Sequence, residues 1–172
     1  MKITYTKTIY INNNSTFFKN FNKSFPEEKS VTNEELNYYF VNDYYDLTDE
    51  YTFDITIDRV VRFVGMNENG TIFDFKDNKK GKFAINYDTN CLNFGCDFIF
   101  ENITFLNFNN LGEKKLSLFQ VVSDEMNFGL TFQNCIFKNN KCILIKYMKE
   151  HDCNTEISSD KYSQVTVHNC QF

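Results

Sequence analysis

Acidic and basic side chains that could perform acid–base chemistry fall in one part of the sequence. Asp54, Asp58 and Asp74 lie near Arg59 and Arg62 along the chain. Hydrolysis of a glycosidic bond needs two carboxylates held together as general acid and base, and elimination needs a base that removes a proton. No two aspartates are adjacent in this sequence. We therefore interpret the three aspartates as solvent-facing strand residues and expect no catalytic group.

Cysteine and histidine offer a second possible chemistry, metal binding. The six cysteines are Cys91, Cys96, Cys135, Cys142, Cys153 and Cys170. The spacing of Cys91 and Cys96 fits neither a zinc knuckle nor a thioredoxin motif. His151 and Cys153 could be joined by Cys142 or His168, but no standard ligand spacing is present. We interpret residues 148–163 as a polar insertion and predict neither a metal nor another cofactor, while an even number of cysteines leaves disulfides open.

Composition and charge narrow the classes of function. The chain has 172 residues, 42% of them hydrophobic, which is enough for one domain with a core. Its net charge is −5 and its aromatic residues are 20 Phe and 10 Tyr, with no Trp. A nucleic-acid-binding protein is expected to carry a basic face, so we expect no nucleic-acid partner; we interpret the lysines of residues 76–82 as part of a solvated turn.

No segment is apolar over the roughly 18 residues that a membrane span requires. The first residues alternate like a β-strand and lack the apolar run of a signal peptide. The sequence therefore predicts no membrane-spanning segment, and the chain is either cytosolic or an internal or processed piece of a longer protein.

An internal repeat in the second half determines which fold the sequence predicts. Three copies share apolar residues at positions 1, 3, 6 and 8 and Asn at position 5, and they span Phe98–Phe105, Leu130–Phe137 and Val165–Phe172. Their asparagines are Asn102, Asn134 and Asn169, with spacings of 32 (134 − 102) and 35 (169 − 134). Copies that recur at such intervals are typical of solenoids.

The pattern inside each copy predicts a bend at the asparagine. Positions 1 and 3 share one face of a strand, but position 6 has the opposite parity and would point to the other face of a straight strand. Asn tolerates the left-handed backbone conformation that turns the chain, so both halves can direct their apolar residues inward. Stacked asparagines could also hydrogen-bond to one another as an asparagine ladder. We assign structural roles to Asn102, Asn134 and Asn169 and to the inward-facing Phe105, Phe137 and Phe172.

Cys135 and Cys170 occupy the same position in consecutive copies, where the first copy has Ile103. Stacked strands lie about 4.8 Å apart, a separation that a disulfide permits. A small buried thiol also satisfies an apolar position without a bond. We therefore expect Cys135 and Cys170 to be free, structural core cysteines.

Further strands precede each copy, and together they predict an all-β fold, a right-handed parallel β-helix. These strands lie within residues 83–87, 116–122 and 142–147, and an earlier coil comprises 55–65 and 71–75 around an Asn67–Gly70 turn. Residues 1–45 do not repeat, so we assign them to an N-terminal cap and 46–172 to the repeats. Thr32–Glu35 resembles a helix start. The last coil ends at Phe172, and we expect it to pack on further repeats or another chain.

Several of these segments resemble the pectin-lyase-like parallel β-helix repeats, most closely those of adhesin-like surface proteins of methanogenic archaea. The similar segments are Asp49–Ile57, Val61–Gly65, Gly70–Asp74, Phe100–Phe105 and Asn134–Asn140. The resemblance covers residues 46–172 and implies a large, surface-anchored protein. The double-glycine strand starts of bacterial autotransporter repeats are not found here.

The sequence and this resemblance predict a non-catalytic, structural and adhesive segment of an extracellular or cell-surface protein. Its strand faces and loops would bind surface glycans or proteins. One alternative is a carbohydrate-active β-helix, either a polysaccharide lyase or hydrolase or a glycan-binding module, since the same fold carries both. A third reading, an intracellular metal-linked module, rests on the histidine and cysteine residues alone.

Overall fold

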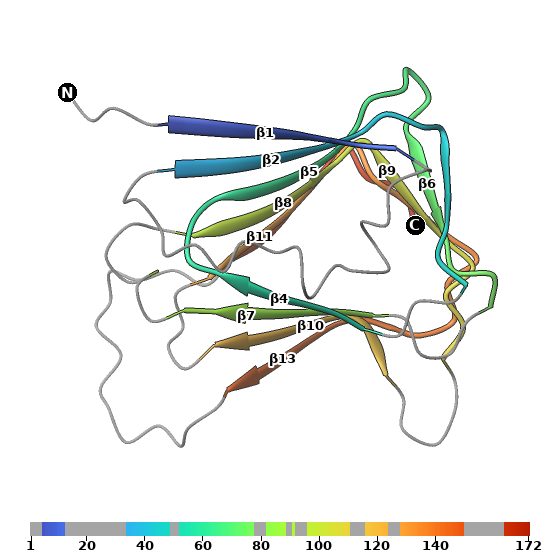
Figure 1. The fold of residues 1–172 in the computed structure, drawn as a ribbon. Helices are drawn as coiled ribbons and strands as arrows, with labels where there is room; N and C mark the ends of the chain where they lie inside the picture. Colours follow the sequence, from blue (N-terminus) through green and yellow to red (C-terminus); the bar gives the residue numbers. More distant parts are fainter. Residues whose placement is uncertain are drawn as a thin grey trace.

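Three parallel β-sheets form the walls of a solenoid (Figure 1). The computed structural model describes residues 5–12, 34–48, 52–77, 82–88, 91, 96–110, 116–123, 128–149 and 164–172. Every strand pairing among these residues is parallel. The chain is therefore all-β and winds through the three sheets in turn, as the repeat predicts.

Among the described residues, sheet A has six strands and sheets B and C have four each, because four turns add one strand to every sheet and sheet A has one further strand at each end. Sheet A has the order β1-β2-β5-β8-β11-β14, sheet B the order β12-β9-β6-β3 and sheet C the order β13-β10-β7-β4. The strands of sheet A are β1 (Tyr5–Ile11), β2 (Glu34–Phe40), β5 (Val61–Gly65), β8 (Asp97–Glu101), β11 (Gly129–Gln133) and β14 (Gln164–His168). Those of sheet B are β3 (Tyr44–Asp46), β6 (Thr71–Asp74), β9 (Ile103–Leu106) and β12 (Ile136–Lys138). Those of sheet C are β4 (Thr52–Ile57), β7 (Lys82–Tyr87), β10 (Ser117–Ser123) and β13 (Ile143–Lys149).

The alternation of side chains along each strand explains why these segments form the walls. In β8 and β9 the inward residues Phe98, Phe100, Ile103 and Phe105 are almost completely buried. The two halves of a repeat copy lie in different sheets, A and B, with the predicted bend between them. A continuous apolar interior results, because residues that pair across neighbouring strands carry side chains of the same kind.

Stacked aromatic rings fill this interior. One inward column of sheet B passes from Tyr45 through Phe73 and Phe105 to Phe137, which pair in register. The ring of Phe105 lies 5.2 Å from that of Phe137, almost parallel to it, and 5.2 Å from that of Phe119 in sheet C. Such contacts add stability beyond the area that they remove from water.

Phe172 continues this aromatic column but is not buried. Its ring stacks on Phe137 at 5.1 Å, yet 77% of the side chain is exposed. Val165 and Val167 of β14, also inward by register, are 44% and 46% exposed. The third repeat copy therefore has the predicted arrangement, whereas its apolar residues are not core residues among those that the structure describes.

The structure corrects the helix that the sequence suggested near Thr32. Residues 34–40 and 44–46 form β2 and β3 instead. Leu36, Tyr38 and Phe40 alternate along β2 and are buried at 1% exposure or less, a period of two that belongs to a strand. Strands β1 and β2 lie within residues 1–45, the segment assigned to a cap, and β3 crosses its boundary; they extend sheets A and B.

The column of phenylalanines gives a direct test of the packing. Phe105→Ala should lower the free energy of unfolding by about 3–5 kcal/mol, because it leaves a cavity among rings on all three sheets. Phe172→Ala, in the same column but mostly exposed, should cost about 1 kcal/mol or less. Urea unfolding followed by circular dichroism measures both. Equal losses for the two variants would contradict the packing described here.

Candidate functional site

The three repeat asparagines form the corner between sheets A and B. Asn102, Asn134 and Asn169 have φ angles of 57°, 53° and 50°, in the left-handed region. The Asn102 side chain donates to the carbonyl oxygens of Gly65 at 2.8 Å and Asn67 at 2.7 Å, which fixes the preceding turn. Asn169 donates to Asn134 Oδ1 at 3.3 Å, one step of the predicted ladder. These residues therefore hold neighbouring turns of the solenoid together.

A second asparagine corner, which the sequence analysis missed, ends the strands of sheet B. Asn107 and Asn139 also have positive φ angles, 58° and 56°. Asn139 donates to Asn107 Oδ1 at 3.5 Å, and Asn107 donates to Asp74 Oδ1 at 3.0 Å. Their spacing of 32 (139 − 107) equals that of Asn102 and Asn134. The signal was therefore present in the sequence, five residues after Asn102 and five residues after Asn134.

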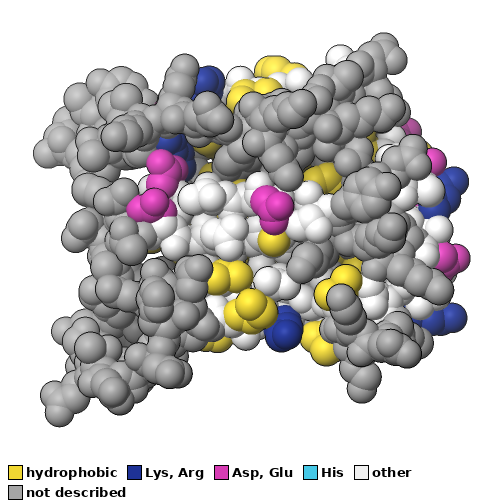
Figure 2. All heavy atoms as spheres, turned by 60° about the horizontal axis from the view of Figure 1, so that its bottom comes forward, with side chains coloured by type: hydrophobic (Ala, Val, Ile, Leu, Met, Phe, Trp, Pro, Cys, Tyr) yellow, Lys and Arg dark blue, Asp and Glu magenta, His cyan; other side chains and the backbone are white. Residues whose placement is uncertain are grey.

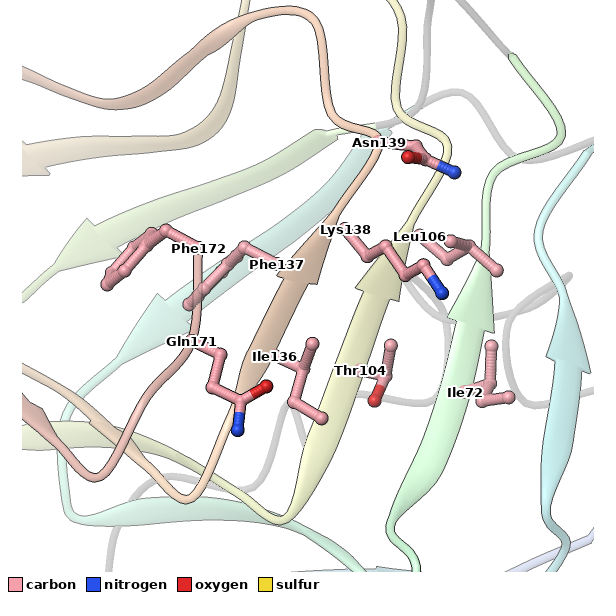
Figure 3. A pocket seen from close by; sticks show the side chains of 9 residues that line it. All are labelled: Ile72, Thr104, Leu106, Ile136, Phe137, Lys138, Asn139, Gln171 and Phe172. Atoms are coloured by element: carbon pink, nitrogen blue, oxygen red, sulfur yellow. The ribbon is translucent and has the colours of Figure 1, made fainter.

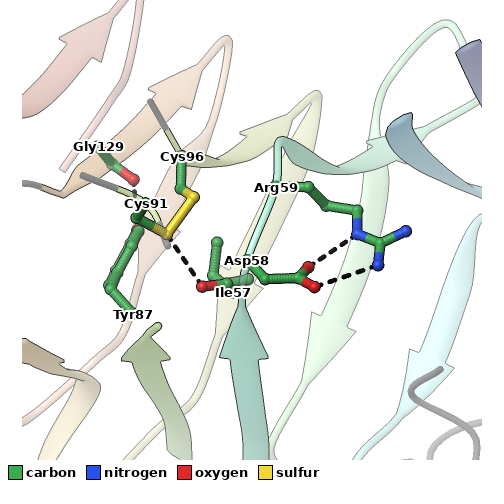
Figure 4. Close-up of a disulfide and its surroundings, with 7 residues drawn as sticks. All are labelled: Ile57, Asp58, Arg59, Tyr87, Cys91, Cys96 and Gly129. Carbon is green, nitrogen blue, oxygen red and sulfur yellow. Dashed lines mark hydrogen bonds and ion pairs between the residues drawn. A yellow bond between two sulfur atoms is a disulfide. The ribbon is translucent and has the colours of Figure 1, made fainter. Parts of the chain in front are cut away.

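The structure separates the charged residues that could have formed an acid–base site. Arg59 is buried and pairs with Glu34 and with Asp58, whose Oδ1 lies 2.7 Å from Arg59 Nε (Figure 4). The hydrogen bond to Asp58 raises the pKa of the Arg59 guanidinium. Asp54 is on the outer face of sheet C. The ion pairs of Arg59 with Asp58 and Glu34 hold the corner between β4 and β5.

Asp74 lies elsewhere, at the end of β6. It accepts hydrogen bonds from the Tyr44 hydroxyl at 2.9 Å, from Asn107 and from the backbone nitrogen of Lys76. Two of these donors come from neighbouring turns of the solenoid. Asp74 therefore links neighbouring turns through hydrogen bonds. Our interpretation of Asp74 as a solvent-facing residue is wrong, since only 6% of it is exposed.

Arg62 lies near Asp97, an acidic residue that the sequence analysis did not single out. Burial raises the pKa of the Asp97 carboxyl, and both a hydrogen bond from Thr131 Oγ1 at 3.1 Å and the charge of Arg62 oppose that rise. A Cβ atom on Gly129 would lie 2.8 Å from Asp97 Oδ1, so a larger residue there would require the Asp97 side chain to shift. Asp97 lies at the start of β8, on the outer face of sheet A, where Thr131 of β11 hydrogen-bonds to it.

Figure 2 shows the side of the solenoid that is at the bottom of Figure 1. An acidic side chain lies near the centre of this view, and other acidic and basic side chains lie toward its edges. Within the described part of the chain, no three His, Cys, Asp or Glu residues are placed to hold a metal ion. His168 is exposed on β14, while His151 and Cys153 lie outside the described residues.

No helix in the described ranges is both long and apolar enough to cross a membrane.

The cysteines divide into a disulfide and free thiols. Cys91 and Cys96 form a disulfide, with their Cα atoms 5.1 Å apart, between β7 and β8 (Figure 4). Both residues are buried, and Cys91 Sγ also lies 3.1 Å from the carbonyl oxygen of Ile57. Cys135, Cys142 and Cys170 are free, as expected for Cys135 and Cys170. The sequence analysis left this bond open, because a pair of cysteines on one turn has no distinguishing sequence signature.

A groove on the outer face of sheet B is the best candidate for a binding site (Figure 3). It has a volume of about 580 Å³. Ile72, Thr104 and Ile136 form a row across β6, β9 and β12, because they pair in register. Leu106 and Lys138 form a second row beside it, and Asn139, Gln171, Phe137 and Phe172 complete the lining. The groove runs along the solenoid and crosses its strands.

The groove combines apolar side chains with hydrogen-bonding groups and one charge. Lys138, an exposed lysine, is the charged residue among those that line it. Tyr44 of β3 continues the row beyond Ile72. The Lys76 ammonium nitrogen lies over its ring, 5.6 Å from the ring centre. Hydrogen bonding to the Tyr44 hydroxyl raises the pKa of Lys76. The groove therefore presents apolar side chains, hydrogen-bonding groups and a positive charge side by side along one face of the solenoid.

A comparison of the chain with known protein families, with curated proteins and with solved structures found no match.

The first asparagine corner predicts an unusual order of stability for two substitutions. Asn102→Gly keeps the left-handed conformation and loses two side-chain hydrogen bonds, whereas Asn102→Ala also strains the backbone. The alanine variant should therefore be less stable than the glycine variant by about 1 kcal/mol. At Asn86, inside strand β7, the order should reverse, with glycine less stable than alanine. Chemical denaturation of the four variants decides this, and the same order at both positions would refute a left-handed corner.

The disulfide should stabilise the fold measurably. Cys91→Ala combined with Cys96→Ala should lower the free energy of unfolding by about 2 kcal/mol, the value expected for closing so short a loop. Reduction of the natural protein should give a similar loss. The test is urea unfolding with and without a reductant, in the natural protein and the double variant. Identical midpoints for the oxidised and reduced natural protein would show that the bond does not contribute.

Proposed function

We propose that this chain is a non-catalytic, rigid binding segment of an extracellular or cell-surface protein, and that the groove on sheet B binds a glycan chain. The observation that carries the proposal is the row of Ile72, Thr104 and Ile136 along the solenoid, flanked by Lys138. Sugar rings have apolar faces and hydroxyl edges, and such a row offers apolar contacts and hydrogen bonds in alternation. Lys138 favours a glycan that carries carboxylates.

The rigidity of the solenoid supports a role in binding extended ligands. Neighbouring turns are tied by parallel ladders, by corner asparagines and by aromatic stacking. The residues of the groove therefore keep their spacing without a ligand, which lowers the entropy that binding costs. Repeat proteins use such elongated surfaces for recognition.

The disulfide supports the proposed location. Structural disulfides persist mainly in oxidising compartments, such as the exterior of the cell. Cys91 and Cys96 are 1% and 6% exposed, so their bond belongs to the interior of the fold. We propose on this basis, and on the resemblance of residues 46–172 to pectin-lyase-like and adhesin-like repeats, that the chain is a right-handed β-helix of a surface protein.

A pair of lysine variants tests the groove. Lys138→Glu should weaken binding to soluble polygalacturonate by about 10-fold to 100-fold, because it replaces an attractive charge with a repulsive one. Lys141→Glu, an exposed lysine of the same turn outside the groove, should bind as the natural protein does. Affinity electrophoresis in gels that contain the polysaccharide measures both, with neutral xylan as the uncharged comparison.

Two results would count against this function. If both variants, or neither, lost affinity, the groove would not be the binding site. Release of unsaturated or reducing sugars by the natural protein would instead favour the carbohydrate-active enzyme.

A further inference from the structure

Two free thiols lie in neighbouring turns of the solenoid. Gln133 pairs with His168 and Ile136 with Gln171, so the register places Cys135 directly beneath Cys170. Hydrogen bonds on both sides hold this register: Asn134 N donates to His168 O at 2.9 Å, and Gln171 N donates to Cys135 O at 3.0 Å. Adjacent parallel strands are about 4.8 Å apart, within the Cα separation of natural disulfides.

The sulfur of Cys170 already lies against the turn that contains Cys135. Its Sγ is 3.4 Å from the backbone nitrogen of Cys135 and 3.5 Å from the carbonyl oxygen of Phe132. The Sγ of Cys135 lies 3.4 Å from Phe100 O, which belongs to the neighbouring turn on the side away from Cys170. A bond between the two sulfurs requires the Cys135 side chain to turn toward Cys170 and to give up its weak thiol contacts with Phe100 O and Gln133 O, each at 3.4 Å.

The two thiols differ in access to solvent. Cys135 is completely buried, whereas Cys170 is partly exposed. Burial raises the pKa of the Cys135 thiol to about 12. An oxidant from solution therefore meets Cys170 first, since the thiolate is the reactive form and must be reachable.

We propose that Cys135 and Cys170 are a redox site, and that they form a second disulfide that fastens β14 to β11. The Cys170 thiolate attacks one sulfur of a small disulfide such as oxidised glutathione and releases one glutathione thiol. The Cys135 thiolate then attacks the Cys170 sulfur and releases the second. The two protein thiols lose two protons and two electrons, and the oxidant is reduced to two thiols.

The position of the pair gives this bond a consequence. Strand β14 lies at the end of sheet A in the described structure, and its Val165 and Val167 are 44% and 46% exposed. Few buried contacts hold such a strand, so it opens more easily than the strands inside the stack. A bond between Cys135 and Cys170 prevents that opening. The inference depends on this local geometry and does not require the groove to bind a glycan.

The test maps cysteine pairing after oxidation. The purified chain is incubated with oxidised glutathione, unfolded under acidic conditions, alkylated and digested for mass spectrometry. We expect a linked pair of peptides that contain Cys135 and Cys170, lighter by two hydrogens, while Cys142 is alkylated. Alkylation of both Cys135 and Cys170 in molecules that retain the Cys91–Cys96 bond would overturn the proposal. A bond from Cys170 to Cys142 or Cys153 would also overturn it.

Hydrogen exchange tests the consequence. Oxidation should slow exchange of the β14 amides on the order of 100-fold, the effect expected from closing a loop of this length. Cys170→Ser, which changes the exposed partner, should abolish this difference, and Cys142→Ser should preserve it. Equal exchange in the oxidised and reduced natural protein would contradict a fastening role, and that comparison needs no variant.

Discussion

The bend at the corner asparagines is the constraint on which the rest of this structure depends. A straight strand would direct half of each repeat's apolar residues into solvent, because successive side chains alternate in direction. The left-handed conformation of Asn102, Asn134 and Asn169 turns the chain between sheets A and B, so that both halves face one interior. Other residues adopt this conformation at a cost of about 1–2 kcal/mol, which is why asparagine recurs there.

Once the bends are set, each turn of the chain places its residues directly beside those of the next. The parallel register brings equivalent side chains together. Inward-facing phenylalanines therefore form columns inside the solenoid, and outward-facing residues form rows on its surface. The same register accounts for the two features to which we assign roles. It lines up Ile72, Thr104 and Ile136 in a groove, and it places Cys170 against Cys135.

The sequence predicted what depends on a local, repeated pattern. The strands after residue 50, the bends and the inward phenylalanines all follow from residue type and spacing. It failed where the contacts are long-range or the pattern is short. The helix-like start signal at Thr32–Glu35 overlaps the start of β2, and the pairing of β2 with β1 and β5, together with the burial of its alternate residues, shows it to be a strand. The Cys91–Cys96 bond, the groove and the ties of Asp74 depend on how separate turns meet, which spacing along the chain does not reveal.

The most direct test of the central claim is to measure contacts between backbone protons of successive turns by nuclear magnetic resonance. The account predicts in-register parallel contacts between residues 32 apart, such as Phe100 and Phe132, and 35 apart, such as Phe132 and Val167. It also predicts left-handed backbone shifts at Asn102, Asn107, Asn134 and Asn139. Antiparallel contacts between consecutive strands, with extended backbone shifts at these asparagines, would contradict the solenoid.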